Sequence, residues 1–401
     1  MGQPGGMVEP GTYILYTLLM GSMLLFSQPS AKAVIDERTG LITFPHYWGS
    51  NLAGLIILYS FIVGCRYYVG IDYKVYVEIF LELKETGSVS REIEFGFEFM
   101  YKVLNLLNVH FTFIFILMAL FQMFFFYKAL EKFPFILPWF TFFFFVSLMM
   151  FSSMNIMRQS LAWFVFFYAL NLAIEKKWGL VLLCIFFGYS FHKTMLIGVL
   201  TYPLLFTDIA KNKYVQIGIL LVVTVLASSI LTIVLAAVSP LVNLLGYGYY
   251  IDNMEYMYEI TAEKKVGAGT ANALFFVVDI AIMWYSPELK ENFKKYDFYK
   301  YYNLYFVGAI LDRIVSDNFI MARTNDYLLN FRVVIMSFFF YFLFNTQTQK
   351  TGKRLFGCII ALIMVIFFYK AIYNRAADNS PFRFVFMEDR LQTRPQKLSN
   401  Y

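Results

Sequence analysis

Apolar runs and short polar connections alternate along most of the chain. A helix that crosses the hydrocarbon core of a bilayer needs about 17–25 mostly apolar residues. The pattern predicts about twelve such spans: 12–26, 47–65, 111–127, 135–151, 158–174, 178–191, 194–206, 215–238, 269–285, 301–319, 326–344 and 355–373. His192 interrupts the apolar stretch between two of them, which are either two short helices or one long bent helix. The predicted fold class is therefore all-α, a polytopic transmembrane bundle.

An amphipathic stretch follows the second apolar run, which ends abruptly at Arg66. Apolar side chains recur on one side, at Val75, Ile79 and Leu83, with Tyr76 and Phe80 beside them, whereas the opposite side holds Lys74, Glu78, Glu82 and Glu85. This spacing is typical of a helix that lies in the membrane interface. A further helical stretch opens at Glu98, so residues 66–98 form a predicted interfacial loop and helix.

Composition supports a membrane protein and excludes other classes. Hydrophobic residues make up 59% of the chain and charged residues only 15%, and a soluble domain of this length could not cover so much apolar surface. The formal net charge of +6 is spread over the connections and gives no argument for nucleic acid. The three cysteines have no CxxC spacing and the three histidines are not spaced as a zinc set, so we expect no metal or cofactor.

Basic residues are concentrated in every second connection. They are Lys32, Arg38, Lys128, Lys132, Lys176, Lys177, Lys211, Lys213, Lys290, Lys294, Lys295, Lys300, Lys350, Lys353 and Arg354. The positive-inside rule places these connections on the cytoplasmic face. The polar clusters then lie on the outer face, with the long loop 239–268. We expect one integral membrane domain, 1–373, followed by an extracytoplasmic polar tail, 374–401.

Four arginines lie at or just inside the outer ends of spans: Arg66, Arg158, Arg313 and Arg323. An arginine at membrane depth is costly and usually faces a cavity or a partner. Its guanidinium matches phosphate oxygens bidentately, so several arginines from different helices would bind a diphosphate. The alternative is that each is an interfacial anchor, or that Arg313 forms an internal ion pair with Asp317. Gln159, beside Arg158, opens the same helix, and a helix N-terminus attracts anions.

Acids, a histidine and tyrosines accompany these cations on the predicted outer face. Asp72 and Glu98 could accept a proton, as could His192, although a lone buried histidine is more often structural. Tyrosines suit sugar faces but are enriched at any membrane interface. By contrast, the phenylalanine runs 124–126, 142–145 and 338–340 are expected to face lipid.

The order of the motifs along the chain resembles that of the EpsG family. The motifs are RYYVGIDYKVY at 66–76, EFGFE at 94–98, NIMRQSLA at 155–162, FHKT at 191–194, and a late Arg323 with Tyr327. The family pattern commonly has threonine or glycine where Ile71 stands. The resemblance covers about 47–344, and the end of the chain matches poorly.

The EpsG family contains Wzy-type polymerases of bacterial exopolysaccharide, capsule and O-antigen synthesis. The resemblance implies a glycosyltransferase of GT-C-like architecture at the outer face of the bacterial cytoplasmic membrane. Such enzymes join oligosaccharide repeat units carried on undecaprenyl diphosphate. The growing chain moves from its lipid diphosphate to the non-reducing end of a new unit, and no metal is thought to be needed. Expected partners are the lipid-linked oligosaccharide, the bilayer, a chain-length regulator and a flippase.

These motifs suggest a division of roles among the residues. The diphosphate-binding set is Arg66, Arg158, Arg323, Lys193 and Gln159; the catalytic candidates are Asp72, Glu98 and His192; and the sugar-binding candidates are Tyr67, Tyr73, Tyr76 and Tyr327. A flippase or transporter for a lipid-linked sugar is an alternative, although the sequence has no internal duplication and its polar clusters are one-sided. A ligase that moves polymer to a lipid acceptor is another.

Overall fold

A computed structural model describes residues 9–35, 42–231, 233, 237, 240, 268–315, 319–345 and 351–387. The chain divides into two compact units, which we describe separately. Unit 1 comprises 1–168, 186–192 and 368–401, and unit 2 comprises 169–185 and 193–367. The predicted loop 239–268 lies outside the described residues except at its two ends, and so do Arg38, Asp317, Lys350 and the last part of the tail.

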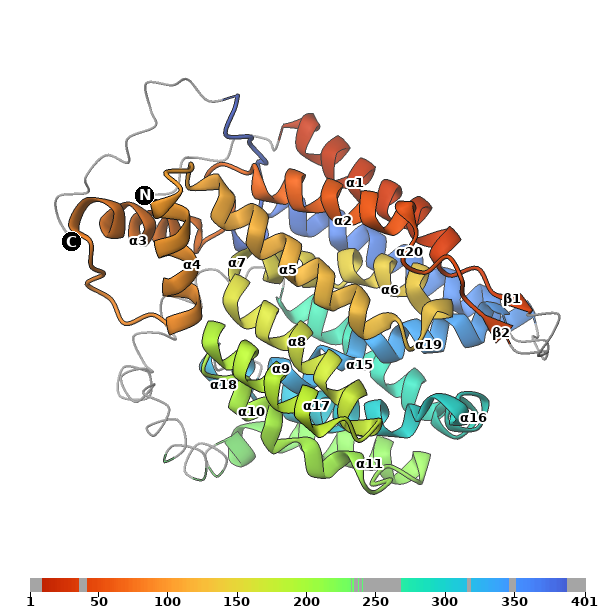
Figure 1. Ribbon diagram of the computed structural model, residues 1–401. Coiled ribbons are helices and arrows are strands. Elements are labelled where there is room, and N and C mark those ends of the chain that lie inside the picture. Colours follow the sequence, from red (N-terminus) through yellow and green to blue (C-terminus); the bar gives the residue numbers. More distant parts are fainter. Residues whose placement is uncertain are drawn as a thin grey trace. The chain divides into compact units, whose positions relative to one another are not determined.

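Unit 1 is built from the N-terminal helices of the chain (Figure 1). Its elements are α1 (Pro10–Ser30), β1 (Val34–Ile35), β2 (Ile42–Thr43), α2 (Ser50–Gly64), α3 (Tyr73–Thr86), α4 (Phe95–Leu106), α5 (Thr112–Leu130), η1 (Pro134–Ile136), α6 (Leu137–Val146), α7 (Met149–Asn155), the first part of α8 (Met157–Ile174), the end of α9 (Trp178–Phe191), the end of α20 (Thr351–Tyr373) and η4 (Ala376–Asp378). The two short strands pair antiparallel, Val34 with Thr43.

Helices α1, α2, α5 and α6 run side by side (Figure 1), and aromatic rings pack between α5 and its neighbours α6 and α8. The ring of Phe126 on α5 lies 4.8 Å from that of Phe140, 5.1 Å from Phe144 and 5.4 Å from Phe164. The expectation that these phenylalanine runs face lipid is wrong for most of them: Phe126, Phe143–Phe145 and Phe338–Phe340 are buried in protein, whereas Phe124 is exposed. Apolar composition alone cannot distinguish a protein neighbour from a lipid neighbour.

The predicted amphipathic helix is present as α3, and α4 follows it as expected. The apolar side chains of α3 are buried, namely Tyr76, Ile79, Phe80 and Leu83. The rings pack on protein, because Phe80 lies 5.7 Å from Tyr101 of α4 and Tyr73 stacks on Phe115 of α5 at 4.6 Å. The apolar face of α3 therefore contacts α4 and α5.

Unit 2 holds the remaining elements. They are the last part of α8, the start of α9, α10 (Met195–Leu200), η2 (Tyr202–Leu205), α11 (Lys213–Val225), α15 (Ala268–Trp284), α16 (Ser286–Asn292), η3 (Lys294–Tyr296), α17 (Phe298–Val315), α18 (Phe319–Leu329), α19 (Phe331–Asn345) and most of α20. Helix α17 is central, since its tyrosines reach three partners: Tyr301 donates to Asn171 at 2.6 Å, Tyr302 to Gln216 at 2.5 Å and Tyr305 to Asp279 at 3.0 Å.

Four helices within the described residues are long and apolar enough to cross a membrane: Pro10–Ser30, Thr112–Leu130, Met321–Asn345 and Thr351–Tyr373. A fifth span results if the pair Pro134–Val146 and Met149–Asn155, bent by 66°, counts as one. The chain is thus a helical membrane protein, but several of the twelve expected spans are shorter or broken. The expected span 194–206 is α10 followed by the 3-10 turn η2, which explains why hydropathy overstated its length.

The start of the predicted polar tail packs against the N-terminal part of unit 1. The backbone N–H of Tyr67 donates to Arg383 O at 2.9 Å, and that of Val385 donates to Cys65 O at 2.9 Å. Residues Arg66 and Phe384 thus form an antiparallel bridge. The Tyr16 hydroxyl of α1 donates to Asn379 O at 2.6 Å. The tail is therefore part of the fold as far as Met387.

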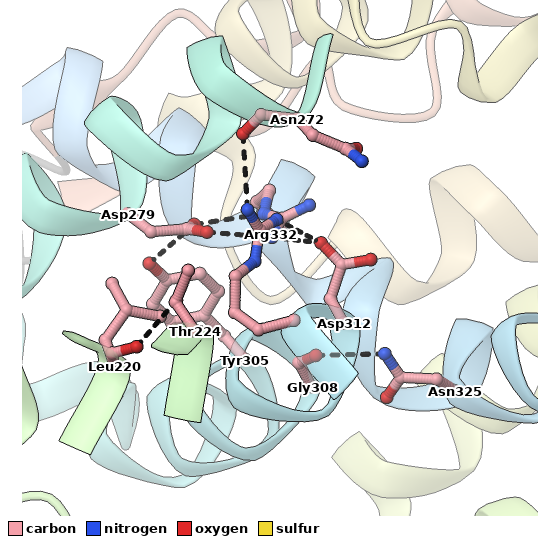
Figure 2. A network of polar contacts seen from close by, with 10 residues as sticks. Leu220, Thr224, Asn272, Asp279, Tyr305, Gly308, Asp312, Asn325 and Arg332 are labelled. Atoms are coloured by element: carbon pink, nitrogen blue, oxygen red, sulfur yellow. Dashed lines mark hydrogen bonds and ion pairs between the residues drawn. The ribbon is translucent and has the colours of Figure 1, made fainter. Parts of the chain in front are cut away.

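A buried network of charges holds α15, α17 and α19 together in unit 2 (Figure 2). Arg332 binds Asp279 through two hydrogen bonds of 3.0 and 2.8 Å, and its Nη2 also donates to Asp312 at 3.0 Å. Arg313 adds a bond of 2.5 Å to the same Asp312 carboxylate. Two arginines and two aspartates balance in charge, which is the condition for burying ions in an apolar core.

We expect Asp279→Ala to lower the free energy of unfolding by about 3–5 kcal/mol, because it leaves two buried guanidinium groups with one carboxylate. Denaturation in mixed micelles would measure the change. The control is Glu131→Gln, which removes the partly exposed Lys128–Glu131 pair and should cost less than about 1 kcal/mol. Equal effects of the two substitutions would contradict a stabilising role for the network.

Candidate functional site

The candidate site is built around a break between two helices of unit 1. Helix α7 ends at Asn155, and α8 begins at Met157. Ile156 between them has φ −85° and ψ 53°, outside the helical region. A second irregularity precedes α7, where Leu148 adopts a left-handed conformation with φ 66° and the chain bends by 66° from α6. The sequence between the two bends therefore presents backbone groups that no helix satisfies.

Side chains from three other elements satisfy the carbonyl groups at the end of α7. Gln122 of α5 donates to Ser153 O at 3.1 Å, Arg66 to Met154 O at 2.8 Å, and the Tyr76 hydroxyl of α3 to Asn155 O at 3.3 Å. Gln122 also donates to Met157 O across the break, at 2.9 Å. The first and third motifs of the sequence are joined by these contacts.

Arg66 is only 1% exposed and acts as a helix cap in this arrangement. Besides Met154 O, it donates to Val63 O at 2.7 Å and to Val69 O at 3.2 Å. Its guanidinium lies 4.5 Å from the Phe115 ring. Burial lowers the pKa of Arg66 to about 10, so the group remains a cation at neutral pH, and a cation is favourable at a helix C-terminus. These contacts position backbone rather than present a phosphate-binding surface.

Arg158 lies in the first turn of α8 and pairs with an acid that the sequence reasoning did not select. Its Nη1 donates to Oε2 of Glu94, the residue that precedes α4. The guanidinium also lies 5.2 Å from the Phe97 ring and 6.0 Å from the Tyr76 ring. The Arg158 side chain is 24% exposed and that of Glu94 is 8% exposed. Arg158 is thus the more accessible of the two candidate arginines in unit 1.

The EFGFE motif places Glu94 by a close backbone contact. A Cβ atom on Gly96 would lie 2.4 Å from Ser190 Oγ and 2.8 Å from Ser190 O, so no larger residue fits there. Ser190 is two residues before His192, whose backbone N–H continues α9 by donating to Gly188 O at 2.9 Å. The contact at Gly96 therefore places the EFGFE motif beside Ser190, the residue that precedes the FHKT motif.

The other acids have different surroundings. Glu98 forms an ion pair with Lys102 at 2.6 Å, in which the lysine side chain is 57% exposed and that of Glu98 is 35% exposed. Asp72 is partly buried at the N-cap position of α3 and makes no side-chain capping hydrogen bond. Gln159, next to Arg158, is buried at 4% exposure. The acid that pairs with Arg158 is Glu94, which the sequence analysis did not select.

The tyrosines proposed for sugar binding are mostly core residues. Tyr67, Tyr73 and Tyr76 are 7%, 2% and 5% exposed. Tyr68 is 48% exposed, has a left-handed φ of 49°, and packs edge-on against Tyr67 at 4.7 Å. Residues 65–70 form an elbow between α2 and α3. Because a sugar needs an accessible ring, the tyrosine of this elbow that is available for stacking is Tyr68.

The remaining candidates belong to unit 2. Tyr327 on α18 is fully buried, and its hydroxyl lies 3.1 Å from Thr194 Oγ1, which follows Lys193. Arg323, one turn earlier on α18, is half-buried, as is Lys193. The last motif thus meets the end of the FHKT motif. The predicted convergence of Arg158 with Arg323 stays a prediction, as does the role of every candidate residue.

Comparison of the chain with models of protein families agrees with the resemblance that the motifs indicated. The model of the EpsG family matches residues 52–384. The chain belongs to the EpsG family, the family of Wzy-type polysaccharide polymerases and exopolysaccharide biosynthesis proteins. Neither the curated proteins nor the solved structures gave a match. The family match begins slightly later than the expected 47 and extends past the expected end at 344 to Phe384, the residue whose backbone pairs with Arg66. Within the described residues no cluster of three His, Cys, Asp or Glu could hold a metal ion.

We expect Arg66→Lys to destabilise this EpsG-family protein by about 2–4 kcal/mol, because one ammonium group cannot reach three carbonyl oxygens that a guanidinium fork spans. The unfolding midpoint in detergent would measure the loss. Arg91→Lys, the same substitution at an exposed position, is the matched control. If both variants unfold alike, the capping role of Arg66 is wrong.

Proposed function

We propose that this protein is a glycosyltransferase that joins oligosaccharide repeat units carried on undecaprenyl diphosphate. The growing chain leaves its lipid diphosphate and is transferred to the non-reducing end of a new unit. Membership of the EpsG family gives the class, polysaccharide biosynthesis. The observation that carries the specific reaction is Arg158, a partly accessible arginine in the first turn of a helix that starts at a capped break.

A departing diphosphate needs positive charge close to its bridging oxygen. Arg158 offers a guanidinium, which binds two phosphate oxygens at once, and the N-terminus of α8 adds the positive end of the helix dipole. Arg66, Gln122 and Tyr76 hold the preceding helix end, so the cation is in place before the charge develops. Such preorganised charge is usually the largest contribution to catalysis.

Unit 2 holds three further candidates of this proposal. Arg323 and Lys193 are candidates for binding a diphosphate, and Tyr327 is a candidate for orienting sugar or phosphate. Their mutual proximity is supported by the Thr194–Tyr327 contact, which links the segment after His192 to α18. Asp72, Glu98 and His192 are the candidates that the sequence offers for accepting the proton of the acceptor hydroxyl, and Tyr68 supplies an exposed aromatic ring.

The proposed setting is the cytoplasmic membrane of a bacterium, with the site on the outer face. It is supported by the basic residues of the alternate connections, which favour the cytoplasmic side. About twelve spans in a GT-C-like arrangement would require that the short apolar helices also cross the bilayer, together with adjoining segments. Ser50–Gly64 and Trp178–Phe191 are examples. A chain-length regulator and a flippase are the expected functional partners.

A flippase or transporter is the second candidate, because broken helices such as the α6–α7 pair also occur in transporters. It would bind the same lipid diphosphate without breaking a bond. A ligase would break the same bond and use a different acceptor. Product analysis separates the three: a ladder of lengthened glycans requires a polymerase, whereas a transporter leaves the substrate unchanged.

We expect purified protein to convert a synthetic lipid-diphosphate repeat unit into a ladder of products, and Arg158→Ala to reduce the rate by about 100–1,000-fold, since the variant loses charge stabilisation of the leaving group. Gel electrophoresis of a labelled repeat unit measures both. Arg91→Ala removes an exposed arginine and should leave the rate unchanged. A folded Arg158→Ala protein with wild-type rates would remove Arg158 from the mechanism.

A further inference from the structure

We propose that Glu94 is the base of the reaction, and that it becomes available when the donor diphosphate replaces it as the partner of Arg158. The inference rests on the proposed function, because it assigns a residue to that same site. It differs from the candidates that the sequence favoured, which were Asp72, Glu98 and His192.

The geometry of Glu94 carries the proposal. Its carboxylate accepts a hydrogen bond from the guanidinium that would hold the leaving group, so Glu94 lies beside the proposed diphosphate-binding residue. It is 8% exposed, and Gly96 fixes its backbone against Ser190. A base must lie within reach of the proton it takes. Glu98, by contrast, lies one turn further along α4 and pairs with Lys102 at the surface.

The state of Arg158 explains how the exchange takes place. Its Nη1 is paired with Glu94, its Nε is buried and has no hydrogen-bond partner, and its side chain is 24% exposed. A diphosphate carries more charge than a carboxylate and binds a guanidinium in a bidentate manner. It therefore competes for Arg158, and its negative charge repels the Glu94 carboxylate from the pair. The phenyl ring of Phe97, 5.2 Å from the guanidinium, limits where the cation can move.

An acceptor hydroxyl oxygen attacks the anomeric carbon of the donor sugar and forms the new glycosidic bond. The bond between that carbon and the diphosphate oxygen breaks, and its electron pair stays on the diphosphate, which Arg158 stabilises. The hydroxyl proton moves to the Glu94 carboxylate. On release of the lipid diphosphate, Glu94 loses the proton to solvent and pairs with Arg158 again.

The test separates binding from turnover with Glu94→Gln, which keeps the shape of the side chain and removes its charge. We expect this variant to bind a short-chain polyprenyl diphosphate several-fold more tightly, because no carboxylate competes for Arg158. We also expect it to make the product ladder at least about 100-fold more slowly, because an amide cannot take the proton. Fluorescence titration in detergent measures the first quantity, and single-turnover elongation of a labelled repeat unit measures the second.

If affinity and rate fall together, Glu94 only holds Arg158 in place, and the proposal is overturned; it is also overturned if the rate stays within about threefold of wild type, since loss of a general base costs more. Glu85→Gln, an exposed acid on α3, is the matched control and should change neither quantity.

A second variant tests the proposal if the Glu94→Gln protein does not fold. Glu94→Asp keeps the charge but withdraws it by one methylene, so we expect unchanged affinity and a rate reduced about 10–100-fold. Unchanged rate would overturn the proposal. If wild-type protein makes no ladder, the polymerase function fails and the base assignment fails with it, whereas tighter binding by Glu94→Gln would still support the exchange of partners.

Discussion

The arrangement of unit 1 depends on satisfying the backbone at one helix break. Carbonyl groups at the end of α7 cannot bond within the helix, and an apolar surrounding offers no water in place of a protein donor. Gln122, Arg66 and Tyr76 supply these donors from α5, the elbow after α2, and α3. Three elements are therefore tied to one short turn, and the turn fixes where Arg158 begins the next helix.

The arginines in the two sets of buried charges differ in their accessibility. The Asp279–Arg332–Asp312–Arg313 network balances two cations with two anions, and each group has a partner within 3.0 Å. It is a fixed structural element. The Arg158–Glu94 pair is simpler, and its cation is partly accessible. An ion pair whose cation an incoming anion can reach is suited to an exchange of partners, whereas a charge-balanced network whose two arginine side chains are each 7% exposed is not.

The C-terminal segment gives the elbow a second support. Backbone hydrogen bonds join Tyr67 to Arg383 and Val385 to Cys65, on either side of Arg66. Gly70 has a φ of 100°, and its N–H donates to Asp378 O at 2.8 Å. The conformation between Cys65 and Gly70 is thus held from both sides, by α7 and by residues more than 300 positions later in the chain. The family match, 52–384, includes Asp378 and Arg383 of this segment.

The sequence by itself determined the class of the protein and the order of its motifs. Apolar runs require a helical membrane protein because bilayer thickness and backbone hydrogen bonding leave few alternatives. The spacing of Val75, Ile79 and Leu83 predicted α3, since a helix repeats every 3.6 residues. Hydropathy could not tell lipid from protein as a neighbour, so the burial of the phenylalanine runs and the breaks within spans were missed.

Only the tertiary structure decided which charges meet. Arg66 and Arg158 look alike in the sequence, yet one caps α7 and the other pairs with Glu94, because partners 64 to 91 positions away select between these roles. Glu94 and Glu98 are also equivalent as residue types within one motif. Their four-residue separation puts Glu94 before α4 and Glu98 within it, and the folded chain buries Glu94, where Gly96 closely approaches Ser190, but leaves Glu98 partly exposed beside Lys102.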